Sequence, residues 1–189
     1  MCGRYSLNLE HSKSNFKKDT LTKFPKIFTF KNPDISPSSE NPVIFFNNKE
    51  YLFKLFKWGL SYDWLPKGRV LFNIRSETVS DKNFSKDLIS KKRCLVPFNS
   101  YFEWQNIPPS KKKFTLQTKE KFSYFAGVYR EGSEGNEYSI LTKASAQNIK
   151  HIHERSPVIV PKEAVKKWFS DYYLDILDNS SVNINYSEV

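Results

Sequence analysis

Cys2 could carry out unusual chemistry if removal of Met1 made it the first residue of the chain. An amino-terminal cysteine carries a thiol and an α-amine on adjacent carbons, and this amine, with a pKa of about 7.7 to 8, is partly neutral near pH 7. The neutral amine attacks an aldehyde to form a Schiff base, and the neighbouring thiol then closes a five-membered thiazolidine ring. Cys2 therefore predicts a trap for aldehydes, unless it is simply a small residue that permits removal of Met1.

Polar residues also occur in segments that otherwise have the pattern of buried strands. Polar and apolar residues alternate over 72–78, and a period of two would place Asn73, Arg75 and Glu77 on one face of a strand. Because buried polar groups are costly without partners, such residues usually have a purpose. The segment predicts either a binding face or a structural ion pair between Arg75 and Glu77.

Two further segments carry groups suited to proton transfer. Glu103 lies among aromatic residues, and an apolar setting raises the pKa of a carboxyl group toward neutrality, where it can act as a general acid or base. His153 and Arg155 come just before the apolar run 158–160. Each group is a candidate for function. The alternatives are a buried hydrogen-bond acceptor for Glu103 and a core histidine for His153.

The balance of charges favours a polyanionic partner. The 189 residues include 30 Lys and Arg against 20 Asp and Glu, a formal net charge of +10, which is typical of nucleic-acid binding. The alternative is that the whole proteome is rich in lysine. Only six of the basic residues are arginines, and a guanidinium can grip a phosphate or carboxylate at two points. The arginines are therefore the candidates for specific contacts.

Composition excludes several classes of protein. A hydrophobic fraction of 39% and an aromatic fraction of 16% indicate a soluble globular domain rather than a disordered or fibrous chain. No stretch approaches the roughly 20 apolar residues that cross a bilayer, and the first residues lack an export signal. We therefore expect no membrane association and a location in the cytoplasm or nucleoid, or in the nucleus of a eukaryote.

The cysteines and histidines do not predict a metal site. Cys2 and Cys94 are expected to be free thiols, with Cys94 in the core. Together with His151 and His153 they could be imagined as zinc ligands, but their spacing matches none of the usual patterns. We expect neither a metal nor a cofactor.

Extended segments dominate the predicted secondary structure. A β-hairpin is expected at 43–46 and 51–58, and further strands at 70–74, 95–104, 114–118, 122–129 and 138–142. Helices are expected at 11–24, 80–89, 144–150 and 161–177. These elements predict an α+β fold with a mostly antiparallel sheet and peripheral helices. The expected domain covers residues 1–178, followed by a polar tail over 179–189 that is either loosely held or a remodelled last strand.

Taken in order, short motifs along the chain resemble the SOS-response-associated peptidase (SRAP) family, whose members shield abasic sites in DNA. The motifs that carry the resemblance are Met1-Cys2-Gly3-Arg4-Tyr5, Ile35-Ser36-Pro37, Trp58-Gly59-Leu60, Asn73-Ile74-Arg75-Ser76-Glu77-Thr78, Arg93-Cys94-Leu95-Val96-Pro97, Tyr101-Phe102-Glu103-Trp104, Leu141-Thr142 with Ala144, and His153-Glu154-Arg155-Ser156-Pro157-Val158-Ile159-Val160-Pro161. Their order makes chance a poor explanation, and they span Cys2 to about Phe169.

The resemblance implies a single SRAP-like domain with a sheet or barrel core and a cleft for single-stranded DNA. The ring-opened sugar of an abasic site presents an aldehyde. Cys2, freed by removal of Met1, would capture that aldehyde as a thiazolidine and leave a DNA–protein crosslink that shields the strand. The implied partner is single-stranded DNA with an abasic site, including junctions with duplex, and the protein would act as a monomer.

The resemblance also implies roles for individual residues. Asn73 would hold the Cys2 end and the sugar, Glu103 would shuttle protons, and His153 would assist sugar opening and crosslink reversal. The implied DNA contacts are Arg4, Pro37, Trp64, Arg75, Thr142 and Arg155.

Trp64 and the Pro37 loop would form an apolar wedge beside the lesion, whereas Trp58 and Trp104 are expected in the core. The residues that differ from the usual family pattern are Asp34, Ile74, Asn83 and Ser156. Two other functions stay open. One is an N-terminal-nucleophile cysteine peptidase, as the family's name suggests, and the other is a non-catalytic module that coats single strands.

Overall fold

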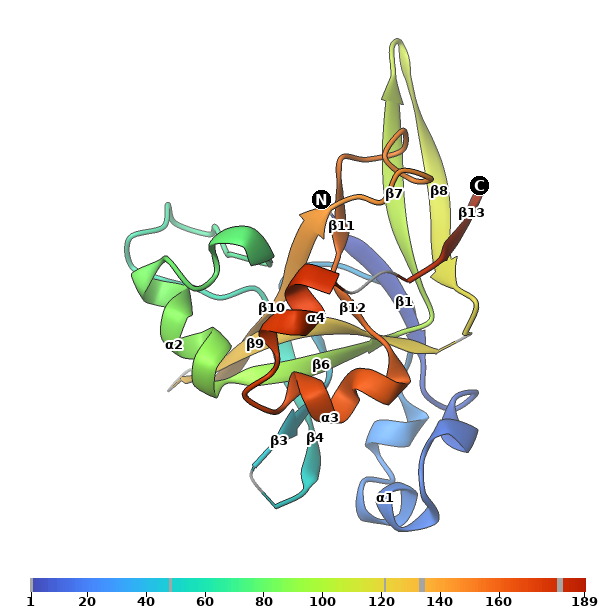
Figure 1. Ribbon diagram of the computed structural model, residues 1–189. Coiled ribbons are helices and arrows are strands. Elements are labelled where there is room, and N and C mark those ends of the chain that lie inside the picture. The colour runs from blue at the N-terminus through green and yellow to red at the C-terminus, as the bar shows by residue number, and fades with distance from the viewer. Residues whose placement is uncertain (1, 48, 121, 133–134, 180–181) are drawn as a thin grey trace.

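Two sheets make up the framework of the computed structural model, which describes residues 2–47, 49–120, 122–132, 135–179 and 182–189 (Figure 1). In the larger sheet, five strands close into a ring: β3 (Glu40–Phe46), β4 (Tyr51–Trp58), β6 (Arg93–Phe98), β9 (Ser123–Gly132) and β10 (Gly135–Ala144). Their pairings are antiparallel except for the parallel pair β4–β10. A closed ring of strands leaves no edge within the barrel.

Three short strands extend the barrel at its margins. They are β5 (Asn73–Arg75) and β11 (Arg155–Pro157), both paired with β10, and β12 (Ile159–Val160), paired with β9. The predicted hairpin is confirmed as β3–β4. The predicted strand at 70–74 is shorter and later, because only residues 73–75 pair with the barrel as a strand.

The second sheet has five strands that run side by side. Their order is β13 (Ile184–Glu188), β8 (Ser110–Thr118), β7 (Ser100–Ile107), β1 (Arg4–Asn8) and β2 (Lys31–Ile35), all antiparallel. The β7–β8 hairpin projects from the body of the molecule, and β13 lies along its outer side (Figure 1). The segment after residue 178 thus contributes an edge strand to the sheet.

The predicted helices are only partly present, and those that form lie outside the sheets (Figure 1). They are α1 (Lys18–Lys23), α2 (Asn83–Lys91), α3 (Val165–Trp168) and α4 (Leu174–Asn179). The single helix expected at 161–177 is wrong, because Arg93 takes the carbonyls of Trp168 (2.8 Å) and Ser170 (3.2 Å) as hydrogen-bond acceptors and α3 ends there. The helix expected at 144–150 is also wrong, since that segment forms turns. In the part of the chain that the structure describes, no helix is long and apolar enough to cross a membrane.

Tyr5 of β1 joins the two sheets through a buried aromatic cluster. Its ring lies 5.2 Å from that of Trp58, and its hydroxyl lies 2.8 Å from the hydroxyl of Tyr138, so these buried polar atoms are paired. Trp58 is fully buried, as predicted. Trp104 is not in the core, contrary to the prediction, but half-buried on the outer face of β7.

A corner at Asn99 carries the chain from the barrel into the second sheet. The continuous strand expected at 95–104 is wrong, because Asn99 separates β6 from β7. Its main-chain N–H donates to Ser6 (2.8 Å), and its side-chain oxygen accepts from the N–H of Asn8 (2.5 Å). These bonds tie the start of β7 to β1, and β7 then runs antiparallel to β1 with Phe102 opposite Arg4. The register brings Glu103 to the beginning of the chain.

Candidate active site

Cys2 lies in a closed site between the two sheets. Its side chain is fully buried, and its Sγ donates a long hydrogen bond to the carbonyl of Arg4 (3.8 Å). The side-chain amide of Asn73, on β5, donates to the carbonyl of Cys2 (2.7 Å). Asn73 therefore fixes the main chain of residue 2 against the barrel.

Glu103 of β7 is the acidic group beside Cys2. Only 4% of its surface is exposed, and burial raises the pKa of Glu103 to about 7. Burial, and then the negative charge of Glu103, raise the pKa of the Cys2 thiol well above its ordinary value. Near pH 7 the site thus holds a neutral thiol and a carboxyl group that is close to half protonated.

Tyr101 belongs to this site, although the sequence analysis did not assign it a role. It lies two residues before Glu103 on the same face of β7, is fully buried, and has a hydroxyl without a hydrogen-bond partner among the described residues. Its pKa is raised by burial, and the charges of Cys2 and Glu103 act in the same direction. The period of two along β7 was the signal that could have found it.

His153 and Glu103 line the same small pocket, together with Tyr101 and Arg155. The main-chain N–H of Arg155 donates to Nδ1 of His153 (3.0 Å), and Nδ1 also lies 3.1 Å from the carbonyl oxygen of Arg155, so the main chain of Arg155 fixes the orientation of the ring. Burial lowers the pKa of His153. The structure therefore brings together the four residues expected to be catalytic: Cys2, Asn73, Glu103 and His153.

Arg155 is held by Glu77 in a two-point ion pair. Its Nη1 and Nη2 lie 2.6 Å and 2.8 Å from the two carboxylate oxygens, and this contact lowers the pKa of Glu77 to about 2. The alternative of an Arg75–Glu77 pair is wrong, because β5 ends at Arg75 and Glu77 lies in the following 3₁₀ turn. Arg75 is exposed and has no ion pair with another described residue, so its guanidinium faces solvent.

Thr142 supports Arg155 instead of facing a ligand. It is fully buried on β10, its carbonyl accepts from Nη2 of Arg155 (2.6 Å), and its hydroxyl lies 3.4 Å from the carbonyl of Ile74. The direct DNA contact expected of Thr142 does not fit this burial.

Arg4 lies on β1 of the second sheet, and Pro37 lies in the turn that follows β2 of the same sheet. Nε and Nη2 of Arg4 bind the two carboxylate oxygens of Asp34 at 2.7 Å and 2.6 Å. Pro37 occupies the second position of a tight turn after β2, and Ser38 follows it with a φ of 72°. The N–H of Ser39 closes this turn on the carbonyl of Ser36 (3.3 Å), the pattern of a type II turn.

Trp64 belongs to a separate aromatic cluster in the segment between β4 and β5. Its ring stacks on Tyr62 (5.2 Å between centroids) and lies 5.5 Å from Phe84 of α2. It is 58% exposed. A large exposed ring held by two neighbours can stack on a base.

The described residues of the site do not form a metal centre. Both cysteines are buried free thiols, and no group of three or more His, Cys, Asp or Glu side chains in the described part of the chain has a metal-binding arrangement.

Comparison with known proteins fixes the family. Residues 1–182 match the family described as SOS response associated peptidase (SRAP). The chain belongs to the SRAP family. The abasic site processing protein YoqW of Bacillus subtilis is 31% identical over 184 residues, which cover 90% of this chain and 80% of YoqW. The abasic site processing protein YedK of Escherichia coli is 27% identical over 116 residues, which cover 59% of this chain and 52% of YedK.

A solved structure shows the same SRAP-like fold. A protein from Bacteroides thetaiotaomicron superposes with a TM-score of 0.80 at 20% identity, covering 100% of this chain and 92% of the other. At this identity the likeness concerns the fold alone. The α+β architecture with a mostly antiparallel sheet system is confirmed.

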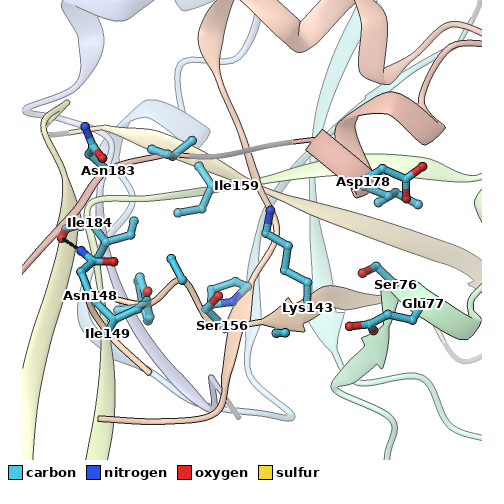
Figure 2. Close-up of a pocket in the computed structure, with 16 residues that line it drawn as sticks. Ser76, Glu77, Lys143, Asn148, Ile149, Ser156, Ile159, Asp178, Asn183 and Ile184 are labelled. Carbon is cyan, nitrogen blue, oxygen red and sulfur yellow. Dashed lines mark hydrogen bonds between the residues drawn. The ribbon is translucent and has the colours of Figure 1, made fainter. Parts of the chain in front are cut away.

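A larger cavity of about 470 Å³ adjoins the pocket of this SRAP chain and shares Tyr101, Ile149 and Ser156 with it. Figure 2 shows Lys143 of β10 pointing into this cavity, with Glu77 and Asp178 on one side. Burial lowers the pKa of Lys143. The opposite wall is closed where the amide of Asn148 donates to the carbonyl of Ile184 (3.1 Å).

Proposed function

We propose that this protein processes abasic sites in single-stranded DNA by forming a thiazolidine crosslink through Cys2 once Met1 has been removed. The observation that carries the proposal is the placement of the buried Glu103 carboxyl beside a Cys2 whose main chain is held by Asn73. The names of the curated relatives, abasic site processing proteins, support the same substrate.

The chemistry needs one proton shuttle and no oxidant. The α-amine of Cys2 adds to the sugar aldehyde, and the resulting hydroxyl leaves as water after Glu103 donates a proton, which forms the C=N bond. The thiol then adds to that carbon, and the Glu103 carboxylate takes back a proton from sulfur. One C–N and one C–S bond replace the C=O bond, and Glu103 returns to its starting form.

The shuttle depends on the pKa of Glu103. A carboxyl group with a pKa of about 7 is both a sufficient acid and a sufficient base near neutral pH. It also supplies the base that the neutral, buried thiol of Cys2 requires. His153, whose ring is oriented by the main chain of Arg155, would assist ring opening of the sugar and reversal of the crosslink.

The residues proposed to contact DNA are of two kinds, exposed side chains and arginines that are already paired with carboxylates. Arg75 and Trp64 are exposed and would contact a phosphate and a base, with Pro37 beside the lesion. Arg4 and Arg155 are already paired with carboxylates, so a phosphate would share or replace these partners.

The test is denaturation-resistant adduct formation with single-stranded DNA that carries an abasic site. We expect Cys2→Ala to abolish the adduct and Cys94→Ala, which removes the other buried thiol, to retain it. Intact mass should show that active protein lacks Met1. An undiminished adduct from Cys2→Ala, or from protein that keeps Met1, would refute the thiazolidine mechanism.

The same samples separate the two other functions. Cleavage of peptides that depends on Cys2, without any adduct, would favour a peptidase. Binding of undamaged strands with neither activity would leave a module that coats single-stranded DNA.

A further inference from the structure

The second sheet has one face in the core and one face in solvent. Along β7 and β8 buried residues such as Tyr101 and Leu116 alternate with half-buried or exposed ones. We call the solvent side the outer face. Its members are Arg4, Ser6 and Asn8 of β1, Asp34 of β2, Ser100, Phe102, Trp104 and Asn106 of β7, Lys111, Lys113, Thr115 and Gln117 of β8, and Asn185 and Ser187 of β13.

Two large aromatic rings lie on the outer face without a role in the core. Phe102 and Trp104 are half-buried, and neither ring packs against another aromatic ring among the described residues. Nζ of Lys113 lies 4.3 Å from the centre of the Phe102 ring and 5.8 Å from that of Trp104. The outer face thus presents two rings with a cation held over them.

Two lysines of the outer face lack a carboxylate partner among the described residues, whereas its arginine, Arg4, is paired with Asp34 (2.6 Å). Lys113 and Lys111 lie opposite Trp104 and Asn106 in the β7–β8 register, and neither lysine pairs with a carboxylate in the described part of the chain. Lys112, between them, points to the other face and pairs with Glu188 (3.0 Å). The hairpin therefore carries two lysines without a carboxylate partner on its outer face and a lysine paired with a carboxylate on its inner face.

The outer face continues into a polar groove at its other end. This groove, of about 830 Å³, is lined in part by Ser6, Asn8, Ser100, Gln117 and Asn185 of the outer face. It also contains Lys31 and Lys119, together with Lys162, which is paired with Glu120 of the same groove (3.0 Å). A continuous path of aromatic, cationic and hydrogen-bonding groups thus runs from the hairpin tip to the groove.

We propose that the outer face is a second binding surface, which takes the single-stranded DNA that flanks the abasic nucleotide. Unpaired bases would stack on Phe102 and Trp104, since open sheet faces and aromatic platforms bind bases in this way. Lys111 and Lys113 would contact phosphates. The rings require unstacked bases, so this surface favours a single strand over a duplex. The identity of the strand rests on the proposed function.

The first test measures the affinity for undamaged single-stranded DNA of about 20 nucleotides, longer than the roughly 4–16 nucleotides that a small β-barrel domain covers. We expect Lys111→Gln with Lys113→Gln to weaken binding about tenfold and to reduce the salt slope by about 1.4, because each phosphate contact contributes roughly 0.7. The matched control is Lys86→Gln with Lys166→Gln, which removes two exposed, unpaired lysines elsewhere. Equal losses in the two double variants would overturn the proposal.

The second test isolates stacking from charge. Trp104→Ala should weaken binding by about fivefold or more, and Trp104→Phe should restore most of it, because base stacking needs only a ring. An unchanged affinity for Trp104→Ala would show that the rings do not contact DNA.

Crosslinking assays keep this inference apart from the proposed function. The lysine variant should form adduct at the wild-type rate with an abasic oligonucleotide too short to reach the outer face, and more slowly with the long one. A slowed reaction with the short oligonucleotide would overturn the separate surface. If no protein forms an adduct, the proposed chemistry fails, while the binding measurements still decide the role of the outer face.

Discussion

The two faces of the second sheet use adjacent residues for opposite purposes. Glu103 points inward, is 4% exposed and has its pKa raised to about 7 by burial. Its neighbours Phe102 and Trp104 point outward, and Lys113 lies over their rings. Strand geometry alone creates this division, since successive side chains alternate between faces.

The comparison shows how burial separates chemistry from polymer binding. On the inner face, groups are fixed by packing and by bonds such as that from Asn73 to the carbonyl of Cys2 (2.7 Å), so protonation states are set by the protein. On the outer face, Lys111 and Lys113 have no carboxylate partner in the described part of the chain and would be available to phosphates. A reaction at one carbon needs the first arrangement, and a flexible strand needs the second.

The largest expected effect lies on the inner face. Glu103→Gln should slow crosslink formation by about 100-fold or more, in the range of general acid–base catalysis. The wild-type rate should follow a bell-shaped pH profile: it rises as the α-amine, with a pKa of about 7.7 to 8, loses its proton, and falls as Glu103, with a pKa of about 7, loses its own. The variant should lose the fall at high pH.

The matched control for this substitution is Glu163→Gln, which neutralises an exposed carboxylate and should leave the rate and its profile unchanged. A Glu103→Gln variant that reacts at the wild-type rate would assign the proton transfers to another group.

The substitution Glu103→Gln, which should slow the reaction, should at the same time make the folded protein more stable. The pKa of Glu103 is about 7 in the folded protein against an ordinary value of 4.5, so the folded state loses stability as pH rises from about 4.5 to 7. Removal of the charge should stabilise Glu103→Gln relative to wild type by about 3 kcal/mol at pH 8. Near pH 4 the difference should be small. Thermal unfolding at the two pH values measures this, and a variant less stable at pH 8 would contradict the burial argument.

Local sequence patterns were sufficient to predict many of the strands and the residues that could carry out the chemistry. Runs of β-branched and aromatic residues bounded by turn residues identified β3, β4, β8 and β10, because these residue types favour strands. Cys2 and Glu103 were found from their own chemical properties. Their mutual proximity was implied only by the family resemblance, since it depends on the register of β7 against β1.

Errors arose where distant residues decide the local structure. Arg93 ends α3 by binding carbonyls more than 70 residues away in sequence, and Asn99 makes a corner because β1 supplies its partners. Trp104 was predicted in the core, but only the sheet topology decides which face of β7 is covered. The pairing of Glu77 with Arg155, rather than Arg75, has the same cause.

The smallest expected effect is on the free energy of unfolding, and it concerns two ion pairs of the same geometry in different surroundings. Arg155–Glu77, at the inner pocket, and Arg4–Asp34, on the outer face, are both two-point pairs, but the arginine side chains are 18% and 42% exposed. Glu77→Gln should lower the free energy of unfolding by about 1 kcal/mol at pH 7, a value reduced for solvent screening because Glu77 is 48% exposed. Asp34→Asn should lower it by less than about 0.5 kcal/mol.

The pH dependence of this difference follows from the direction of the shift. Because the pKa of Glu77 is lowered to about 2 from 4.5, its contribution is complete above about 4.5 and is lost as the pH falls toward 2. Urea unfolding of Glu77→Gln and wild type should therefore differ at pH 7 and converge at low pH. If Asp34→Asn proved as costly as Glu77→Gln, exposure would not be what distinguishes the two faces, and the charges of the outer face would be as firmly held as those inside.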